Sequence, residues 1–378
     1  MRTAIYIIVA LVAALCILWR RRLQPVRRYG SVDVIIPAFN EEVCITDSIY
    51  RLLENRYFRN VIVVNDGSTD ATGKVIDLLA QKHDRLTVIH QANTGKGGAL
   101  MAGIRHSTAE LVFLTDADTT LPPDDDGVGY LLAEIAEGAD AVGGIPLSDL
   151  DGAGILPHIR ASTKLIVISL HRTFQQIVGG APFLISGACG LFRREVLLDV
   201  PFSDRTKVED LDLTWSLVEQ GYIVRQSNRC FVYSQECNSL AAEWKRWRRW
   251  IAGYATCMRL HRQLLLTRFG LLTVIPVALS SFVAVSFLGR ALAPVVMRGD
   301  WVHLPLYLFP WQWMLAVYAI GAVGAIHHRR PSLILLAPAA LIYVMICYLA
   351  WVLHGLRSLV TGREPARDKP ERYAHVVG

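Results

Sequence analysis

Two carboxylates follow an apolar, strand-like run in the stretch FLTDADTT, residues 113–120. Asp116 and Asp118 are separated by one residue, so they either cap the following turn or hold a metal ion. Hard divalent cations prefer oxygen ligands and commonly bridge protein carboxylates to substrate phosphates. The spacing alone leaves both interpretations open.

A glycine-rich segment, NTGKGGAL at 93–100, could bind an anion. A P-loop needs glycine six residues before its lysine and Ser or Thr after it, where this chain has His90 and Gly97. A dinucleotide fingerprint fails at Leu100. Lys96 still stands at a predicted helix start, where backbone N–H groups favour an anion. A turn with a solvated lysine is the alternative.

Two further acidic segments have the same ambiguity. Asp66, in NDGSTD at 65–70, either binds a ligand or caps the helix that follows. Glu209 and Asp210 either do chemistry or form the acidic first turn of a helix.

Strand-like and helical segments alternate between about residues 30 and 235, which predicts an α/β domain. The sheet should be mostly parallel, with helices on both faces. The predicted strands are 31–39, 60–66, 86–91, 111–118 and 140–145, and the predicted helices are 42–54, 71–82, 97–107 and 128–137. Ligands bind such sheets at the carboxyl ends of the strands, which is where the polar segments fall.

Apolar segments at both ends of the chain predict membrane anchoring. Hydrophobic residues make up 52% of the chain, and the mean hydropathy is +0.33. The run at 3–19 is followed by the basic cluster 20–28, which indicates a retained anchor with that cluster in the cytoplasm. Three more candidate spans lie at 269–291, 304–325 and 332–354.

These spans predict a multi-pass protein of the plasma membrane with a cytoplasmic catalytic domain. Three full C-terminal crossings would leave the basic tail outside, against the positive-inside trend, so either the tail is an exception or one candidate does not cross. The net charge of +6 lies largely beside apolar stretches, which indicates a lipid bilayer as partner and no nucleic acid. The seven cysteines form no CxxC pair, which argues against a disulfide framework or zinc site.

Taken together, the motifs resemble those of membrane-integrated, inverting, processive-type members of glycosyltransferase family 2. Poly-N-acetylglucosamine, chitin-oligosaccharide and hyaluronan synthases are similar. The motifs in order are IIPAFNEE (35–42), NDGSTD (65–70), NTGKGGAL (93–100), DAD (116–118), SGACGLFRREVL (186–197), VEDLDLTW (208–215) and RWRRW (246–250). Each is weak alone, but seven in the family's order form a specific signal.

The resemblance implies a GT-A (Rossmann-like) fold with N- and C-terminal transmembrane helices. The expected regions are an anchor with basic flank (1–28), a cytoplasmic GT-A domain (29–238), an amphipathic interfacial helix (239–262), about three transmembrane helices (263–356) and a basic tail (357–378).

The resemblance also implies the donor site. The donor would be a UDP-sugar, with Asp66 on the uracil side and the loop from Pro37 to Glu41 beside it. Lys96 and Arg249 would contact the phosphates. Asp116 and Asp118 match the DxD motif, which holds the diphosphate through Mg²⁺ or Mn²⁺.

For the acceptor side, the resemblance makes Asp210 the general base and Glu209 its support, with Val208 in place of the usual Thr. The acceptor would be lined by Gly187, Ala188, Cys189, Arg246 and Trp250. Arg246 stands where the family usually has Gln. Trp244, Trp247 and Trp250 recur every three residues, which also fits a helix on a membrane surface.

The expected activity is transfer of a sugar, N-acetylglucosamine in the first instance, to the non-reducing end of a growing glycan. Transfer of one sugar to a polyprenyl phosphate or glycolipid is an alternative. A non-catalytic membrane scaffold or polyanion-binding protein is an alternative of another class. The presence of Asp66, Asp116, Asp118 and Asp210 disfavours it, because a protein that binds anions needs no carboxylates around them. Four spans are few for a polysaccharide channel, so we expect either short products or a channel shared within a homo-oligomer.

Overall fold

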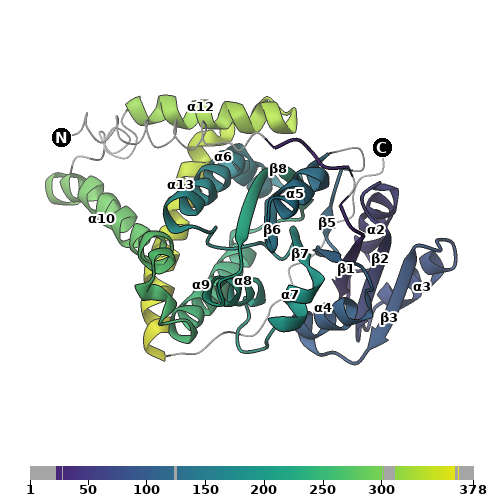
Figure 1. Ribbon diagram of the computed structural model, residues 1–378. Helices are drawn as coiled ribbons and strands as arrows, with labels where there is room; N and C mark the ends of the chain where they lie inside the picture. The colour runs from purple at the N-terminus through teal and green to yellow at the C-terminus, as the bar shows by residue number, and fades with distance from the viewer. Residues whose placement is uncertain are drawn as a thin grey trace. The chain divides into compact units, whose positions relative to one another are not determined.

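The structure is a computed structural model that describes residues 23–27, 29–122, 126–299, 301, 311–361 and 365. The chain divides into two compact units (Figure 1). The first comprises residues 1–152, 168–235 and 372–378, and the second comprises 153–167 and 236–371. The candidate anchor at 3–19 and most of the basic tail lie outside the described residues.

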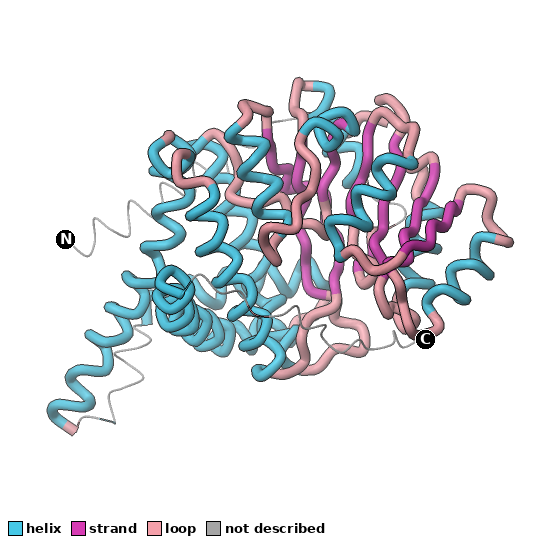
Figure 2. The backbone as a smooth tube through the Cα atoms, turned by 90° about the horizontal axis from the view of Figure 1, so that it is seen from below, coloured by secondary structure: helices cyan, strands magenta, loops and turns pink. Residues whose placement is uncertain are grey.

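The first unit is built on one eight-stranded sheet with the order β3-β2-β1-β4-β7-β6-β8-β5. Its strands lie side by side in Figure 2. Their bounds are β1 Val32–Ala38, β2 Asn60–Asp66, β3 Leu86–Gln91, β4 Leu111–Leu114, β5 Thr119–Thr120, β6 Ala141–Ser148, β7 Gly190–Arg193 and β8 Val224–Ser234.

The sheet is mixed, which refines the prediction of a mostly parallel one. Strands β3, β2, β1 and β4 are parallel neighbours, as predicted. Strand β7 runs antiparallel to both β4 and β6, and β5 runs antiparallel to β8. The short glycine-led run of β7 has no strong strand signal of its own, so it is not among the strands predicted from sequence.

Helices bury both faces of strand β1. The helices assigned wholly to this unit are α2 Ile45–Glu54, α3 Thr72–Ala80, α4 Gly95–His106, α5 Gly127–Ala136, α7 Arg194–Asp199 and α8 Glu209–Glu219. Val34 and Ile36 share a core cluster with Ile49 of α2. On the opposite face Ile35 lies against Gly103 of α4. This two-sided burial explains the unbroken apolar run of β1.

The second unit is helical. It contains the first part of α6 Ile155–Gly179, together with α9 Leu240–Leu260, α10 Ile275–Arg298, α12 Trp311–His328 and α13 Ser332–Thr361, with a 3-10 turn at Leu264–Leu266 and a π-helical turn at Gly270–Val274. Trp247 and Ile251 of α9 are buried against Ala350 of α13. The Trp face of α9 therefore packs on another helix of its own unit.

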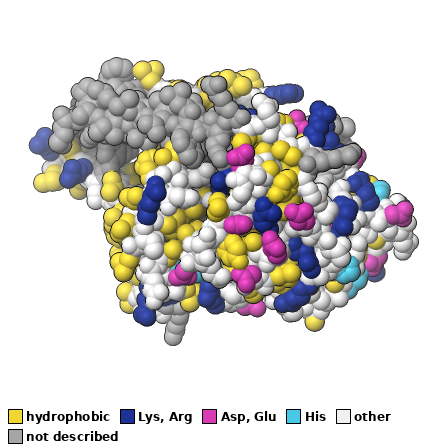
Figure 3. Space-filling model, viewed as in Figure 1, with side chains coloured by type: hydrophobic (Ala, Val, Ile, Leu, Met, Phe, Trp, Pro, Cys, Tyr) yellow, Lys and Arg dark blue, Asp and Glu magenta, His cyan; other side chains and the backbone are white. Residues whose placement is uncertain are grey.

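Only α13 is both long and apolar enough to cross a membrane among the described helices, with a hydropathy of 2.5. The candidate at 269–291 corresponds to the apolar stretch Gly270–Ser286, which is shorter, and the one at 304–325 begins outside the described residues. Hydrophobic side chains gather over the helices of the second unit in Figure 3. Large exposed examples are Val283 and Met297 of α10 and Leu335 and Val360 of α13.

Candidate active site

The candidate site lies in the first unit, at the carboxyl edge of its parallel strands. Strands β1, β2 and β4 run in the same direction, so the segments that follow them emerge at one edge. The predicted strand 111–118 ends earlier, because β4 stops at Leu114 and a turn follows, closed by the N–H of Thr119 donating to the carbonyl of Asp116 at 3.1 Å. The Asp116–Asp118 pair is therefore on a turn, where its side chains can converge on a ligand.

Lys96 lies between the predicted diphosphate ligands and the predicted catalytic acids. It lies in the first turn of α4, which begins at Gly95, two residues earlier than predicted. Its Nζ is 2.6 Å from Asp116 Oδ1 and 3.6 Å from Glu209 Oε1. Because the Lys96 side chain is only 16% exposed, this cation is held in a poorly solvated position between the carboxylates.

Asp210 stands at the start of α8 with both carboxylate oxygens oriented. The N–H of Gly187 donates to Oδ2 at 3.2 Å, and the N–H of Leu211 donates to Oδ1 at 2.9 Å. Burial raises the pKa of Asp210, and the negative charge of Glu209 raises it further, whereas Lys96 and the Gly187 N–H oppose the rise. The arrangement gives a fixed carboxylate with enhanced basicity, as a general base requires.

The 187–189 segment contacts both sides of this site. A Cβ atom on Gly187 would lie 2.9 Å from Lys96 Nζ and 3.7 Å from Asp210 Oδ2, so a larger residue there would displace the Lys96 ammonium. The carbonyl of Ala188 accepts a hydrogen bond from Thr115 Oγ1 at 3.0 Å. The side chains of Ala188 and Cys189 are buried, so the acceptor contact expected of these two residues stays a prediction.

Asp66 holds the loop that leads to Lys96. It is 3% exposed, and its Oδ1 accepts hydrogen bonds from the N–H of Thr94 and from Gln91 Nε2, both at 2.8 Å. It makes no cap to α3, whose N-terminal residue lacks a side-chain cap. The carboxylate therefore fixes the start of α4, and contact with a donor base stays a prediction.

The Pro37–Glu41 loop is joined to the NDGSTD segment through Asn40. Pro37 is half-buried within β1, and Glu41 is buried, with its N–H donating to Thr72 Oγ1 at 2.7 Å. Asn40 adopts a left-handed φ of 55°, which asparagine tolerates better than other non-glycine residues. Its Oδ1 accepts from the N–H of Thr69 at 2.7 Å.

Asn40, Gln91 and Thr94 were not singled out as site residues from sequence. The signal that could have indicated Asn40 is an Asn directly after a strand, where a left-handed turn is common. Gln91 and Thr94 lie in a polar segment at the end of a predicted strand, but their role depends on a carboxylate from another strand.

Asp116 and Asp118 fit a cation that shares its coordination with a substrate. Both are half-buried, and Thr119 Oγ1 lies 3.3 Å from Asp118 Oδ1. Among the described residues no group of three or more His, Cys, Asp or Glu could hold a metal ion. Two carboxylates suffice for Mg²⁺, which typically keeps waters and takes phosphate oxygens.

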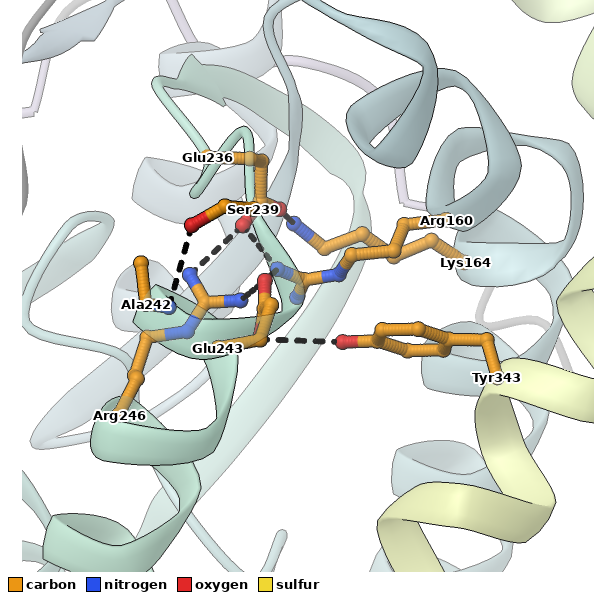
Figure 4. Close-up of polar contacts among 8 residues, drawn as sticks. All are labelled: Arg160, Lys164, Glu236, Ser239, Ala242, Glu243, Arg246 and Tyr343. Carbon is orange, nitrogen blue, oxygen red and sulfur yellow. Dashed lines mark hydrogen bonds and ion pairs between the residues drawn. The ribbon is translucent and has the colours of Figure 1, made fainter.

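The remaining predicted residues, Arg246, Arg249 and Trp250, lie on α9 in the second unit. Arg246 Nη1 donates to Glu236 Oε2 at 2.8 Å, and Nη2 pairs with Glu243 (Figure 4). The guanidinium carbon lies 4.8 Å from the centroid of the Trp250 ring. Arg249 is half-buried. The acceptor and phosphate contacts expected of these three residues stay predictions.

The family model for glycosyl transferase family 2 matches residues 33–200. YaiP of Escherichia coli (strain K12), an uncharacterized glycosyltransferase, is 52% identical over 380 residues, covering 100% of this chain and 95% of YaiP. This chain belongs to glycosyl transferase family 2. It is therefore an enzyme of the glycosyltransferase class.

More distant relatives of this family 2 glycosyltransferase agree. The poly-beta-1,6-N-acetyl-D-glucosamine synthase of Staphylococcus epidermidis is 28% identical over 227 residues, or 59% of this chain and 54% of the synthase. The mannosyltransferase PcManGT from Pyrobaculum calidifontis, solved with GDP-Man and Mn²⁺, has a TM-score of 0.60 at 19% identity, covering 93% of this chain and 94% of that one. That likeness confirms the Rossmann-like GT-A fold.

Proposed function

We propose that this glycosyltransferase transfers N-acetylglucosamine from UDP-N-acetylglucosamine to the non-reducing end of a growing glycan, inverting the anomeric carbon. The observation that carries the proposal is the buried Asp210, oriented by two backbone N–H groups beside the Lys96–Asp116 ion pair. The match to the poly-beta-1,6-N-acetyl-D-glucosamine synthase supports the choice of sugar and of product.

In the proposed reaction Asp210 takes the proton from an acceptor hydroxyl. The hydroxyl oxygen then bonds to the anomeric carbon as the bond from that carbon to the UDP oxygen breaks, so one in-line displacement inverts the centre. Its raised pKa makes Asp210 a stronger base than an ordinary aspartate. Glu209 contributes by its charge, and Gly187 by orienting Oδ2.

Lys96 and the Asp116–Asp118 pair serve the departing diphosphate. Lys96 is placed to offset negative charge that develops as UDP leaves. A Mg²⁺ or Mn²⁺ ion bound by Asp116 and Asp118 would supply further charge neutralisation, and the Mn²⁺ in PcManGT supports this assignment. Asp66 maintains the loop that carries Lys96 through its bonds to Thr94.

We also propose that the enzyme is a multi-pass protein of the plasma membrane with its catalytic unit in the cytoplasm. Helix α13 supports this through its length and hydropathy, and α10 and α13 through their exposed apolar side chains. The basic cluster that follows residues 3–19 supports the orientation.

The test is nucleotide release from a panel of UDP-sugars, with GDP-mannose added because PcManGT binds GDP-Man. Purified full-length chain in detergent receives Mn²⁺ or Mg²⁺, and products are sized on a gel. We expect UDP release and an oligosaccharide ladder with UDP-N-acetylglucosamine alone. Chelation by EDTA should abolish release, and added Mn²⁺ should restore it.

Asp210→Asn should lower kcat about a hundred- to ten-thousand-fold, because a neutral amide accepts no proton. Asp84→Asn, at an exposed turn position away from the site, is the matched control. Release that requires an added polyprenyl phosphate or glycolipid would shift the acceptor to a lipid. Absence of release with every donor would contradict the synthase proposal.

A further inference from the structure

Asp212 of α8 is a buried carboxylate that the proposed reaction does not use. It lies two residues after Asp210, and its side chain is 4% exposed. Ser203 Oγ donates to Asp212 Oδ2 at 2.6 Å. Arg205 Nε donates to the same oxygen and Arg205 Nη2 donates to Oδ1, both at 2.9 Å. The two-point contact with a planar guanidinium fixes the Arg205 side chain in one orientation.

Ser203 and Arg205 belong to the segment between α7 and α8, which we call the 202–207 loop. Asp204, Arg205 and Lys207 are exposed, so burial of these side chains does little to fix the loop. The ion pair and the hydroxyl contact with Asp212 therefore contribute strongly to holding the loop against α8.

The 202–207 loop also lies against the first turn of α4. A Cβ atom on Gly97 would lie 3.4 Å from Phe202 Cβ and 3.5 Å from Asp204 Oδ1, so the loop is within van der Waals reach of this turn. The residue before Gly97 is Lys96, the proposed partner of the diphosphate. The loop therefore borders the turn that presents the Lys96 ammonium.

We propose that Asp212 is a positioning residue that, by holding the 202–207 loop in place, keeps the first turn of α4 where Lys96 can meet the donor diphosphate. This inference rests on the proposed function, in which the donor is a nucleoside diphosphate sugar. Asp212 acts through Arg205 and the loop and does not itself contact substrate. Because Asp210 stands in the same first turn of α8, these contacts link the helix of the proposed base to the turn of the proposed diphosphate ligand, all within the first unit.

The kinetic test is Asp212→Asn in the full-length protein, with UDP-N-acetylglucosamine and a β-1,6-linked N-acetylglucosamine oligosaccharide. Asparagine has nearly the same shape but no charge to hold the Arg205 guanidinium. The donor KM should rise about tenfold, which corresponds to the loss of one hydrogen bond to a charged group. The acceptor KM and kcat should stay within about twofold. The acid limb of the pH profile should stay in place, because Asp210 keeps both backbone N–H donors.

Limited proteolysis with trypsin reports on the 202–207 loop without any turnover. Trypsin cleaves after Arg and Lys, and it needs a segment that can leave the protein surface. Asp212→Asn should therefore be cut several-fold faster than the wild type after Arg205 and Lys207, at a temperature below the unfolding of either protein. Mass spectrometry of the fragments identifies the cleavage sites.

Asp47→Asn is the matched control, because Asp47 also accepts hydrogen bonds from an arginine Nε, that of Arg51, on the exposed face of α2. Arg205→Lys is the second variant. It keeps a positive charge beside Asp212 and loses the two-point contact, so it should raise the donor KM by a smaller factor even if Asp212→Asn fails to fold.

An unchanged donor KM in Asp212→Asn and Arg205→Lys would overturn this inference alone. So would an equal rise in the acceptor KM, an equal rise in Asp47→Asn, or tryptic cleavage of the loop at the wild-type rate. A wild-type enzyme that releases nucleotide from no donor would overturn the proposed function, and this inference with it.

Discussion

Asp210 illustrates how single residues in this site are tuned by their neighbours. Its basicity follows from burial and from the like charge of Glu209, and Lys96 limits it. The same lysine pairs with Asp116, so the proposed base and the proposed diphosphate site share one cation. A substitution of Glu209, Lys96 or Asp116 should therefore shift the pKa of Asp210.

The pH dependence of kcat/KM tests this coupling. Asp210 acts as a carboxylate, so activity is lost as pH falls through its pKa, and a raised pKa places that acid limb above the ordinary range of aspartate. Glu209→Gln removes a like charge and should move the limb to lower pH. Lys96→Met removes a cation, should move the limb to higher pH, and should lower kcat about a hundredfold.

Lys82→Met, at an exposed position, is the control for loss of a lysine. If Glu209→Gln and Lys96→Met shifted the acid limb in the same direction, or left it in place, a group other than Asp210 would limit activity at acid pH.

The acidic candidates for the site could be selected from sequence, because motif order distinguished them from ordinary caps, and their roles stay predictions. The hydrogen-bond and ion-pair partners of the candidate residues could not be selected in this way. Gln91 and Thr94 act only because the fold brings Asp66 to them from another strand. The ion pairs of Arg246 likewise depend on Glu236 and Glu243, and no local pattern predicts that a motif position is enclosed by buried acids.

Among the elements, α4 and β1 depend on each other most closely. Gly103 of α4 faces Ile35 and Val64, and an added Cβ would lie 2.5 Å from Ile35 Cγ2. The glycine thus permits the close approach of helix and sheet. Since Lys96 lies at the start of the same helix, this packing also determines where its ammonium stands.

Gly103→Ala should lower the free energy of unfolding by about 1–3 kcal/mol through overpacking. Denaturant unfolding measures this, and donor KM should rise as α4 shifts. Gly289→Ala in α10, where no described atom lies within 4 Å, is the matched control and should not destabilise. Equal stability of the two variants would mean that α4 retreats from the sheet without strain.

Element prediction was accurate for the first parallel strands and poorer beyond them. Strands β2 and β3 have the predicted bounds, since their apolar runs end in turn-forming residues. The prediction extended β4 by four residues, because the period of the side chains does not reveal where a strand becomes a turn. Strand β7 has four residues and takes its antiparallel place from its neighbours.

At the scale of the whole molecule, the chain combines an α/β unit with a helical unit that exposes apolar side chains. Such exposure on α13 is unusual for a surface in water and is typical of one that meets lipid. The membrane spans predicted at 3–19 and 304–325 fall wholly or partly outside the described residues. Among the described helices, the prediction of a membrane span therefore rests on α13.

We expect the chain to remain in the membrane pellet after extraction with alkaline carbonate. Ile342→Arg places a charge near the middle of α13 and should reduce the membrane-integrated fraction, at a cost of about 2.5–3.5 kcal/mol for insertion. Leu78→Arg, at an exposed position of α3, is the matched control. Recovery of the wild type in the carbonate supernatant would contradict a transmembrane α13.

The continuity of β2 has a consequence for mutational scans. Six of its seven residues are buried, and the last of them is Asp66, which holds the loop of Lys96 in place. Neighbouring codons therefore specify core residues and a residue of the candidate site. A selection for transferase activity alone would score Val63 and Val64 as functional residues, although their side chains lie in the core. Abundance has to be measured beside activity before such a map can tell scaffold from site.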